Sequence, residues 1–300
     1  MVNSFLQYLQ YEKNYSSHTV LSYHSDLLQF QDFLKQSDQD FIPQNIKAEI
    51  IRSWLMELRD SGISARTVNR KLSALKSFYR FLLKQGLVTT DPTAKINSQK
   101  KSKKLPTFFS EKELDQAFEN SENLSNFEAY RNQAILETFY QTGIRLSELI
   151  NLKDTDLDFS RNTIRVFGKR SKERIIPFGE SLKEFLQTYI RERDKQVKRI
   201  TSYLYVRADG KKMYPKLVYR IVLSTMSAVT TQTKCSPHVL RHTFATTLLN
   251  NGADINAVKK LLGHANLAAT EVYTHTTFEQ LQHIYEQAHP RAKKKRSYGN

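Results

Sequence analysis

The chain has 300 residues, of which 39% are hydrophobic and 25% charged, which is enough for two domains that each bury a core. Its formal net charge is +16 and its isoelectric point about 9.7, which favours a nucleic-acid partner over a merely basic protein. The single cysteine, Cys235, excludes a disulfide framework and a thiolate zinc site. We find no signal-peptide pattern and no apolar run of about 18 residues, so we expect a cytoplasmic, nucleoid-associated protein without membrane contact.

The first hundred residues predict a domain of helices. Leucine and phenylalanine recur at helical spacing after a hydroxyl cap at 16–19, and further helices are expected over 47–58 and 64–85. The last helix carries five cationic side chains opposite its apolar stripe: Arg66, Arg70, Lys71, Lys76 and Arg80. A cationic face is often simply solvated, but on a strongly basic chain a helix of this build fits the major groove. We therefore expect these residues to contact DNA.

A polar and basic segment, 97–106, follows this domain. It reads NSQKKSKKLP and has no apolar periodicity, so it is predicted to be a linker. Its lysines at positions 101, 103 and 104 (Lys101, Lys103 and Lys104) are expected to follow the phosphates of a duplex. The predicted organisation is therefore a helical DNA-binding domain over 1–96, the linker, and a second domain over 107–300.

The second domain is predicted to combine helices with a small β-hairpin. A capping box at 110–113 opens one helix, and another is expected over 130–142, where Gly143 ends it. Residues 162–167 and 174–177 predict two strands joined by a basic turn. Further helices are expected over 180–193, 214–229, 237–251, 254–262 and 278–288. The fold class is thus mostly α with a small antiparallel β-hairpin or sheet (α+β).

Six of the eight histidines lie between His238 and His289, and three explanations compete. A metal site would use His238 and His242, four residues apart, but no glutamate stands in the HExxH position and Arg241 would oppose a cation. These histidines would otherwise be ordinary core or surface residues. The third explanation is an anion site, because His238 and Arg241 share a helix face, and phosphoryl transfer needs cations, a proton donor and a positioned nucleophile.

Five segments, taken together and in this order, resemble the motifs of the tyrosine recombinases. They are TGIRLSEL at 142–149, GKRSKER at 168–174, SPHVLRHTFAT at 236–246, and LLGH at 261–264 with YTH at 273–275. Tyr273 follows His264 by nine residues, a separation familiar in that family. The resemblance extends over most of the chain and is closest to the Xer-type members, which share the ending QAHPRA at 287–292.

The resemblance implies a two-domain, C-shaped clamp on DNA and six catalytic residues: Arg145, Lys169, His238, Arg241, His264 and Tyr273. The two arginines would grip the scissile phosphate, because guanidinium groups match phosphate oxygens and stay charged. Tyr273 would attack phosphorus to form a 3′-phosphotyrosyl link, and His238 would accept its proton. Lys169 would protonate the leaving 5′ oxygen, while His264 would donate to the phosphate.

The same resemblance bears on the surroundings of these six residues. Glu148, three residues after Arg145, would either orient that guanidinium or face solvent. Because a tyrosyl ester retains the energy of the phosphodiester bond, neither a cofactor nor a metal is implied. The hairpin tip reads Lys-Arg-Ser where the subgroup often has Lys-Gly-Asn, and a basic tail, Lys293–Arg296, follows the familiar ending.

The implied chemistry also indicates an assembly. Exchange between two duplexes needs four nucleophiles, so four subunits are expected on two double-stranded recombination sites, formed by this chain alone or with a related recombinase. The helix near 278–287 is expected to dock into a neighbouring subunit, with packing on its own domain as the alternative. Whether a DNA translocase activates the enzyme is left open by the resemblance.

The expected function is Xer-type resolution of chromosome or plasmid dimers, which belongs to DNA recombination, chromosome partition and cell division. The integrase or invertase of a mobile element is a close alternative, although the lack of an arm-binding domain favours the Xer type. A catalytically silent DNA-binding protein and a zinc hydrolase are alternatives from other classes. The intact set of six groups argues against the silent protein, since binding alone has no use for a positioned Tyr273.

Overall fold

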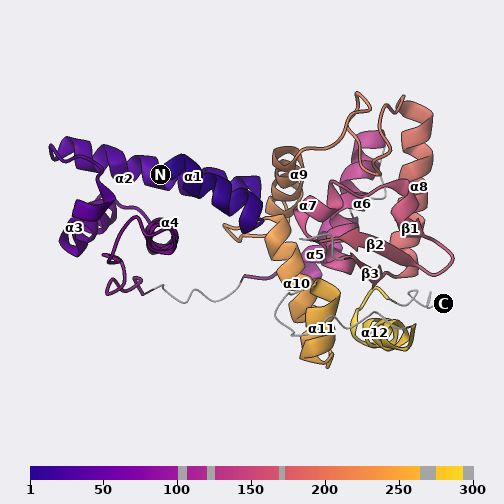
Figure 1. Ribbon diagram of the computed structural model, residues 1–300. Helices are drawn as coiled ribbons and strands as arrows, with labels where there is room; N and C mark the ends of the chain where they lie inside the picture. The colour runs from indigo at the N-terminus through magenta and orange to yellow at the C-terminus, as the bar shows by residue number, and fades with distance from the viewer. Residues whose placement is uncertain (101–106, 120–125, 169–172, 264–274, 293–300) are drawn as a thin grey trace, which may run out of the picture. The chain divides into compact units, whose positions relative to one another are not determined.

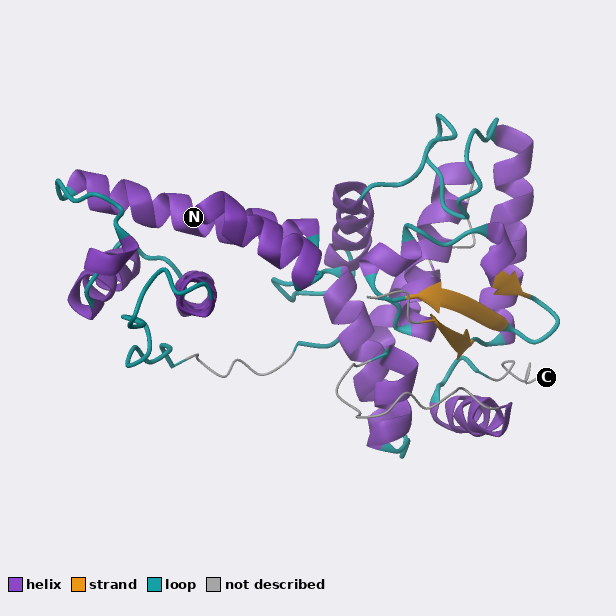
Figure 2. Ribbon diagram, in the orientation of Figure 1, coloured by secondary structure: helices purple, strands orange, loops and turns teal. Residues whose placement is uncertain are grey.

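The computed structural model describes residues 1–100, 107–119, 126–168, 173–263 and 275–292 (Figure 1). The chain divides into two compact units, Met1–Lys104 and Leu105–Asn300. This division falls within 97–106, where the sequence predicts the linker. Both units are built mainly of helices, and one small antiparallel sheet lies in the second (Figure 2). The predicted fold class, mostly α with a small antiparallel sheet, is confirmed.

The first unit is a group of helices around an aromatic core. It comprises α1 (Val2–Gln7), its π-helical continuation η1 (Tyr8–Glu12), α2 (Ser17–Gln36), the 3-10 turn η2 (Pro43–Asn45), α3 (Ala48–Asp60) and α4 (Ala65–Lys84). Ser16 and Ser64 cap α2 and α4 by accepting hydrogen bonds from backbone amides three residues on. The sequence did not predict the helix over 2–12, whose Phe5 packs edge-on against Phe78 of α4.

The end of the first unit returns to α4. The side chain of Asn69 donates to the carbonyl of Gln99 over 2.9 Å and accepts from its amide over 2.8 Å. Lys76 Nζ donates to the carbonyl of Ile96 over 2.7 Å. The first residues of the predicted linker are therefore attached to α4, because a buried asparagine satisfies both polar groups of Gln99.

The second unit places a three-stranded sheet beside a bundle of helices. Its elements are α5 (Glu111–Glu119), α6 (Phe127–Thr142), α7 (Leu146–Leu149), η4 (Asp154–Asp156), β1 (Leu157–Asp158), β2 (Thr163–Phe167), β3 (Glu173–Pro177), α8 (Glu180–Gln196), α9 (Pro215–Ser227), α10 (Pro237–Asn250), α11 (Ile255–Leu262) and α12 (His275–Ala288). The strand order is β1-β2-β3, and Ile164 of β2 faces Ile176 of β3 in the antiparallel register. The two predicted strands form β2 and β3, whereas the two-residue β1 was not predicted.

Helix α6 lies at the centre of this unit, in contact with α8, α9 and α10. Every residue from Gln133 to Thr142 is buried, including the charged Glu137. Gly143 ends α6 in the left-handed conformation with φ 57°, as the sequence predicts. A Cβ at this glycine would lie 2.4 Å from a ring carbon of Phe244 on α10, so only glycine allows this approach.

Helix α12 packs on its own unit in the single chain. It contacts α10, α11 and β3, and buries Leu281 and Tyr285 (Figure 1). This is the alternative to the docking that the sequence analysis favoured. The following residues are anchored too, because the ring of His289 stacks on Tyr285 and bonds to the carbonyl of Tyr140, while burial lowers its pKa to about 3. Docking of α12 into a neighbouring subunit stays a prediction.

None of the helices in the described residues combines the length and the apolar character needed to cross a membrane.

Candidate active site

Arg145 stands at the start of α7, directly after the turn that ends α6. Its backbone amide donates to Oε2 of Glu148 over 2.7 Å, and its Nη1 donates to Oε1 of the same carboxylate over 2.8 Å. The carboxylate thus closes the first turn of a four-residue helix, which would otherwise leave its amides unpaired. The side chain of Arg145 remains 34% exposed, so part of the guanidinium faces solvent.

Glu148 is buried, and a second arginine holds it. Arg174 at the start of β3 donates from Nη1 to Oε1 over 2.8 Å and from Nη2 to Oε2 over 2.9 Å. Burial alone would raise the pKa of Glu148, but the hydrogen bonds and charge of Arg174, with those of Arg145, lower the pKa to about 2. Glu148 therefore orients Arg145 as an ionised group, and the solvent-facing alternative is wrong.

Arg241 reaches the same place from α10, which Ser236 caps by accepting from the amide of Val239. Its guanidinium is buried and donates to the carbonyls of Gly143 and Leu262, the latter over 2.6 Å. Burial, followed by the charges of Arg145 and Arg174, lowers the pKa of Arg241 to about 10, while Glu148 opposes this. The side chain is still a cation at neutral pH.

The carboxyl end of α11 joins three arginines: Arg145, Arg174 and Arg241, which we call the arginine cluster. Arg174 Nε donates to the carbonyl of Leu261 over 2.8 Å, Arg241 Nη2 to that of Leu262, and Arg145 Nη2 to that of Gly263 over 3.0 Å. These carbonyls have no partner within the helix, and the negative end of the helix dipole favours cations there. Three segments distant in the sequence thus place three positive charges on consecutive carbonyls.

Gly263 permits the contact between α11 and the strand. Its φ is 63°, and a Cβ would lie 3.1 Å from Cδ of Arg174, closer than nearly all real contacts of this kind. The glycine of the LLGH motif is therefore required both by packing against Arg174 and by its left-handed backbone conformation.

Two histidines, His238 and His242, lie near the amino end of α10, on either side of Arg241 in the sequence. His238 is exposed in its first turn, one turn before Arg241, and His242 is half-buried. Within the described ranges, no three His, Cys, Asp or Glu side chains are grouped so as to hold a metal ion. The structure therefore brings Arg145 and Arg241 together, and His238 lies on the same helix as Arg241. Lys169, His264 and Tyr273 lie outside the described residues.

Sequence reasoning missed the part that Arg174 plays. This arginine ends the GKRSKER motif, for which the resemblance implies a function only at Lys169. A signal was present, because Arg174 directly precedes the apolar residues of a predicted strand, and a buried arginine needs hydrogen-bond acceptors, among which a carboxylate gives the strongest pairing. The acidic partner could have been sought in TGIRLSEL, the only other of these motifs that contains both an acidic residue and an arginine.

The five cationic side chains of α4 differ in their exposure, and their contact with DNA stays a prediction. Arg66 and Arg80 are exposed, but Arg70 is paired with Asp26 of α2. Lys71 differs from the expectation, because its ammonium group is buried and donates to Asp26 over 2.9 Å. A carboxylate from α2, which helical spacing alone does not reveal, draws this side chain inward. Lys101, Lys103 and Lys104 lie outside the described residues.

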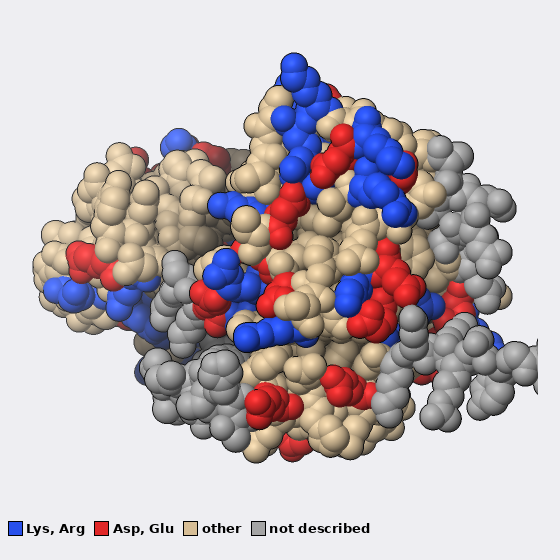
Figure 3. Space-filling view, turned by 90° about the vertical axis from the view of Figure 1, so that its right-hand side faces the viewer, with Lys and Arg blue, Asp and Glu red and all other residues tan. Residues whose placement is uncertain are grey.

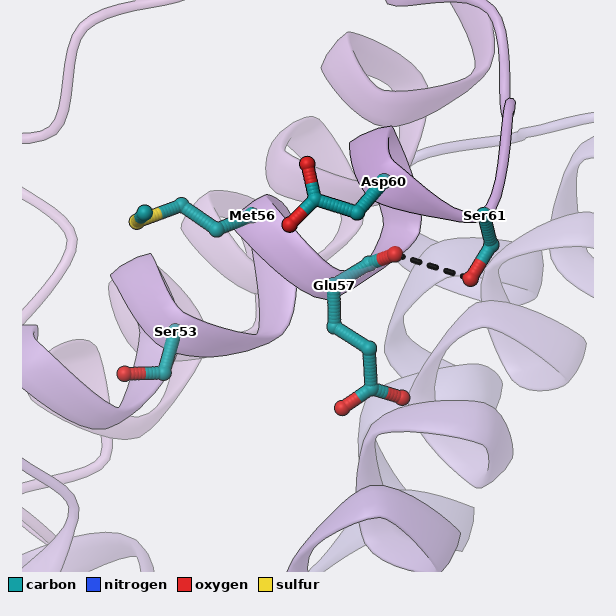
Figure 4. Close-up of a pocket in the computed structure, with 5 residues that line it drawn as sticks. All are labelled: Ser53, Met56, Glu57, Asp60 and Ser61. Atoms are coloured by element: carbon teal, nitrogen blue, oxygen red, sulfur yellow. Dashed lines mark hydrogen bonds between the residues drawn. The ribbon is translucent and has the colours of Figure 1, made fainter.

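Other surfaces do not gather the predicted residues. A hollow on the outer side of α3 is lined by Ser53, Met56, Glu57, Asp60 and Ser61 (Figure 4), and its two carboxylates would repel phosphates. In the view of Figure 3, Lys and Arg side chains alternate with Asp and Glu, so the described residues of that face form no single basic surface. The arginine cluster is therefore the site that the motifs and the structure share.

Matches to known protein families decide the identity. Residues 107–280 match the phage integrase family, and residues 2–86 match the phage integrase N-terminal SAM-like domain. The chain belongs to the phage integrase family. Tyrosine recombinase XerC of Anoxybacillus flavithermus is 40% identical over 295 residues, covering 97% of this chain and 98% of the relative. The XerC of Chlorobaculum tepidum is 38% identical over 317 residues, covering 97% and 94%.

Solved structures agree with this family assignment. The XerA recombinase is 27% identical with a TM-score of 0.50, covering 97% of this chain and 98% of its own. The XerH site-specific recombinase, crystallised with a palindromic difH substrate, has a TM-score of 0.72 at 22% identity, covering 95% and 84%, and supports the fold. The chain is thus a site-specific tyrosine recombinase of the Xer type, an enzyme that cleaves and rejoins DNA through a phosphotyrosine intermediate. The predicted resemblance is confirmed.

Proposed function

We propose that Arg145 and Arg241 bind the scissile phosphate in an active site whose nucleophile is Tyr273. One observation carries the proposal: the two guanidinium groups are anchored on adjacent carbonyls at the end of α11, although they come from α7 and α10. Each uses only two of the five N–H groups of a guanidinium in the bonds described above. The remaining donors are available to non-bridging oxygens of a phosphate.

The chemistry follows from these cations. Oη of Tyr273 forms a bond to phosphorus as the bond from phosphorus to the 5′ oxygen breaks, and the two arginines stabilise the negative charge that develops. The phenolic proton passes to His238, and the departing 5′ oxygen takes a proton from Lys169. In the reverse step a 5′-hydroxyl from the partner strand attacks the phosphotyrosine, so the strands are exchanged without hydrolysis.

Sequence neighbours of described residues support the remaining assignments. His264 directly follows Gly263, whose carbonyl binds Arg145. Lys169 follows Gly168, which comes directly after β2, and it precedes Arg174 of β3 in the sequence. Both residues are therefore near members or contacts of the arginine cluster in the sequence.

We further propose that the biological reaction is resolution of chromosome or plasmid dimers. The support is the similarity to proteins named XerC over nearly the full length of both chains. Four copies, or two pairs with a related recombinase, would act on two duplex sites. In that synapse α12 would leave its own unit and dock on a neighbour.

Covalent capture tests the proposal. Cells expressing the full chain, in which an activating partner such as a DNA translocase is present, are lysed in denaturant, and protein-linked DNA is isolated and sequenced. Tyr273→Phe is the decisive variant, and Tyr219→Phe, on the exposed side of α9, is the matched control. Links that require Tyr273 and not Tyr219 are expected.

The location of the links separates the alternatives. One chromosomal site supports dimer resolution and places the protein on the nucleoid, whereas links at the ends of a mobile element support an integrase. Links that persist in Tyr273→Phe would show that another tyrosine is the nucleophile. No links in any variant, even on pre-nicked duplexes, would favour the silent DNA-binding protein.

A further inference from the structure

The proposed chemistry does not explain why the side chain of Arg174 is buried and fully hydrogen-bonded. It is buried, yet all three of its nitrogens are used: Nε on the carbonyl of Leu261, Nη1 and Nη2 on the two oxygens of Glu148. A buried guanidinium with bidentate geometry holds its partner in one orientation, because the fork and the carboxylate are both planar. Arg174 itself presents little surface to a ligand.

Arg174 and Arg145 share one oxygen of Glu148. Oε1 accepts from Nη1 of both arginines, each over 2.8 Å, while Oε2 accepts from Arg174 and from the amide of Arg145. The direction of the Arg145 guanidinium therefore depends on a carboxylate whose own rotation is fixed by Arg174. Without Arg174, the only described side chain left to hold the carboxylate would be that of Arg145, the residue that it orients.

Arg174 also fixes the end of α11 relative to the sheet. Its bond to Leu261 is the first of the three consecutive carbonyl contacts, and the next two belong to Arg241 and Arg145. The close approach of Gly263 to the Arg174 side chain adds a packing contact at the same point. A shift of β3 would thus move the carbonyls on which both phosphate-binding arginines are anchored.

We propose that Arg174 is a positioning residue for the phosphate clamp: through Glu148 and the carbonyl end of α11 it aims Arg145 and Arg241 at the scissile phosphate. This proposal rests on the function proposed above. The competing explanation is that Arg174 only stabilises the fold, as buried ion pairs elsewhere in the unit do. The two differ in what they predict when the charge of the phosphate is changed.

Arg174→Lys is the informative variant, because it keeps the positive charge and loses the fork. Arg165→Lys is the matched control, since Arg165 lies on the adjacent strand β2, is half exposed and pairs with Asp156 and Glu173 instead. Full-length proteins are compared in single-turnover cleavage of a nicked duplex that carries the captured site. Three scissile linkages are used: the phosphate, a neutral methylphosphonate, and a phosphate with sulfur at the bridging 5′ position.

The three linkages report different parts of the site. A neutral linkage develops less negative charge and depends less on aimed guanidinium groups, whereas a sulfur leaving group needs no proton from Lys169. We expect Arg174→Lys to bind the duplex normally and to cleave the phosphate about 100-fold more slowly, the size of loss that a 1 Å displacement produces. With the methylphosphonate the loss should shrink to less than about 10-fold, and with sulfur it should persist. Glu148→Gln should show the same pattern.

Each other outcome overturns the proposal. Equal losses of rate on all three linkages would indicate a purely structural role. Recovery of the rate with sulfur instead of methylphosphonate would indicate that Arg174 acts through Lys169. An unchanged rate on the phosphate would remove Arg174 from the mechanism. If wild-type protein forms no Tyr273-dependent link with the phosphate duplex, the proposed function fails first, and that result is visible without any Arg174 variant.

Discussion

Arg291, which follows α12, offers a stringent test of how that helix is held on its own unit. Its Nη1 is paired with Glu137, a fully buried carboxylate of α6, and its Nη2 lies 2.9 Å from Oδ1 of Asp115 on α5. Burial raises the pKa of Glu137, and the charge of Arg291 opposes that rise. Arg291→Met would retain most of the packing against the ring of Phe118 but leave a buried charge with one neutral partner, Gln141.

The magnitude follows from that geometry. Removal of one partner from a buried pair costs about 3–5 kcal/mol, and the retained packing places our expectation near 3 kcal/mol at pH 8. In the variant, the folded-state pKa of Glu137 rises further above its unfolded value, so stability falls as pH rises through the folded pKa. The loss relative to wild type should therefore be smaller at pH 5 than at pH 8. The double variant with Glu137→Gln should recover most of it.

The assay can follow the two units separately, because the chain has one tryptophan, Trp54, and it is buried in the first unit. Urea unfolding is followed by circular dichroism for both units and by tryptophan fluorescence for the first alone. Arg291→Met should shift the dichroism transition and leave the Trp54 transition unchanged. A loss below about 1 kcal/mol, or a double variant no more stable than the single one, would refute the reasoning.

Three further predictions concern acid stability, the turn after α6 and DNA binding. The depressed pKa of Glu148, about 2, contributes about 3 kcal/mol that is present above pH 4.5 and lost as pH falls toward 2; urea unfolding across this range should show it in wild type and not in Glu148→Gln. Gly143→Ala should lower stability by about 1–3 kcal/mol or more, since its Cβ would overlap a core ring; thermal unfolding measures this. Arg66→Gln and Arg80→Gln should each reduce the salt dependence of duplex binding by about one unit of slope, whereas Lys71→Met should lower stability and leave that slope unchanged.

Matched controls accompany the last two predictions. Gly62 also has a positive φ, but nothing lies within 4 Å of the position that a methyl group would take there, so Gly62→Ala should suffer only the backbone penalty of about 1 kcal/mol. A drop in Gly143→Ala no larger than this would contradict the steric argument. If the three variants that each remove one cationic side chain of α4 all had the same salt slope, the division between exposed and buried side chains would be contradicted.

Local patterns of the sequence predicted local structure well. The stripe of apolar residues and the cap at Ser64 located α4, which begins one residue later, and Gly143 marked the end of α6. Alternation and the intervening basic turn located β2 and β3. These features depend on residues within a few positions of one another, so the sequence contains what is needed to recognise them.

Pairings between distant segments were not predictable in the same way. Lys71 was expected to contact DNA from the cationic face of its helix, because its partner, Asp26, comes from another helix and could not be foreseen. Glu148 was left between two roles because Arg174, which buries it, comes from a strand 26 residues further along. The motif resemblance supplied Arg145 and Arg241 as candidates, but the backbone carbonyls that anchor them carry no residue identity in the sequence.

This last feature bears on how the enzyme can change during evolution. Because the arginine cluster is held by main-chain carbonyls of Leu261, Leu262 and Gly263, these bonds do not depend on the identity of the two leucine side chains, which are buried and are constrained by core packing instead. The hydrogen bonds that anchor the cations would survive many substitutions there, and a change in backbone direction would disrupt all three at once. Substitutions that preserve this backbone path therefore leave the anchors of the arginine cluster in place while the surrounding surface changes.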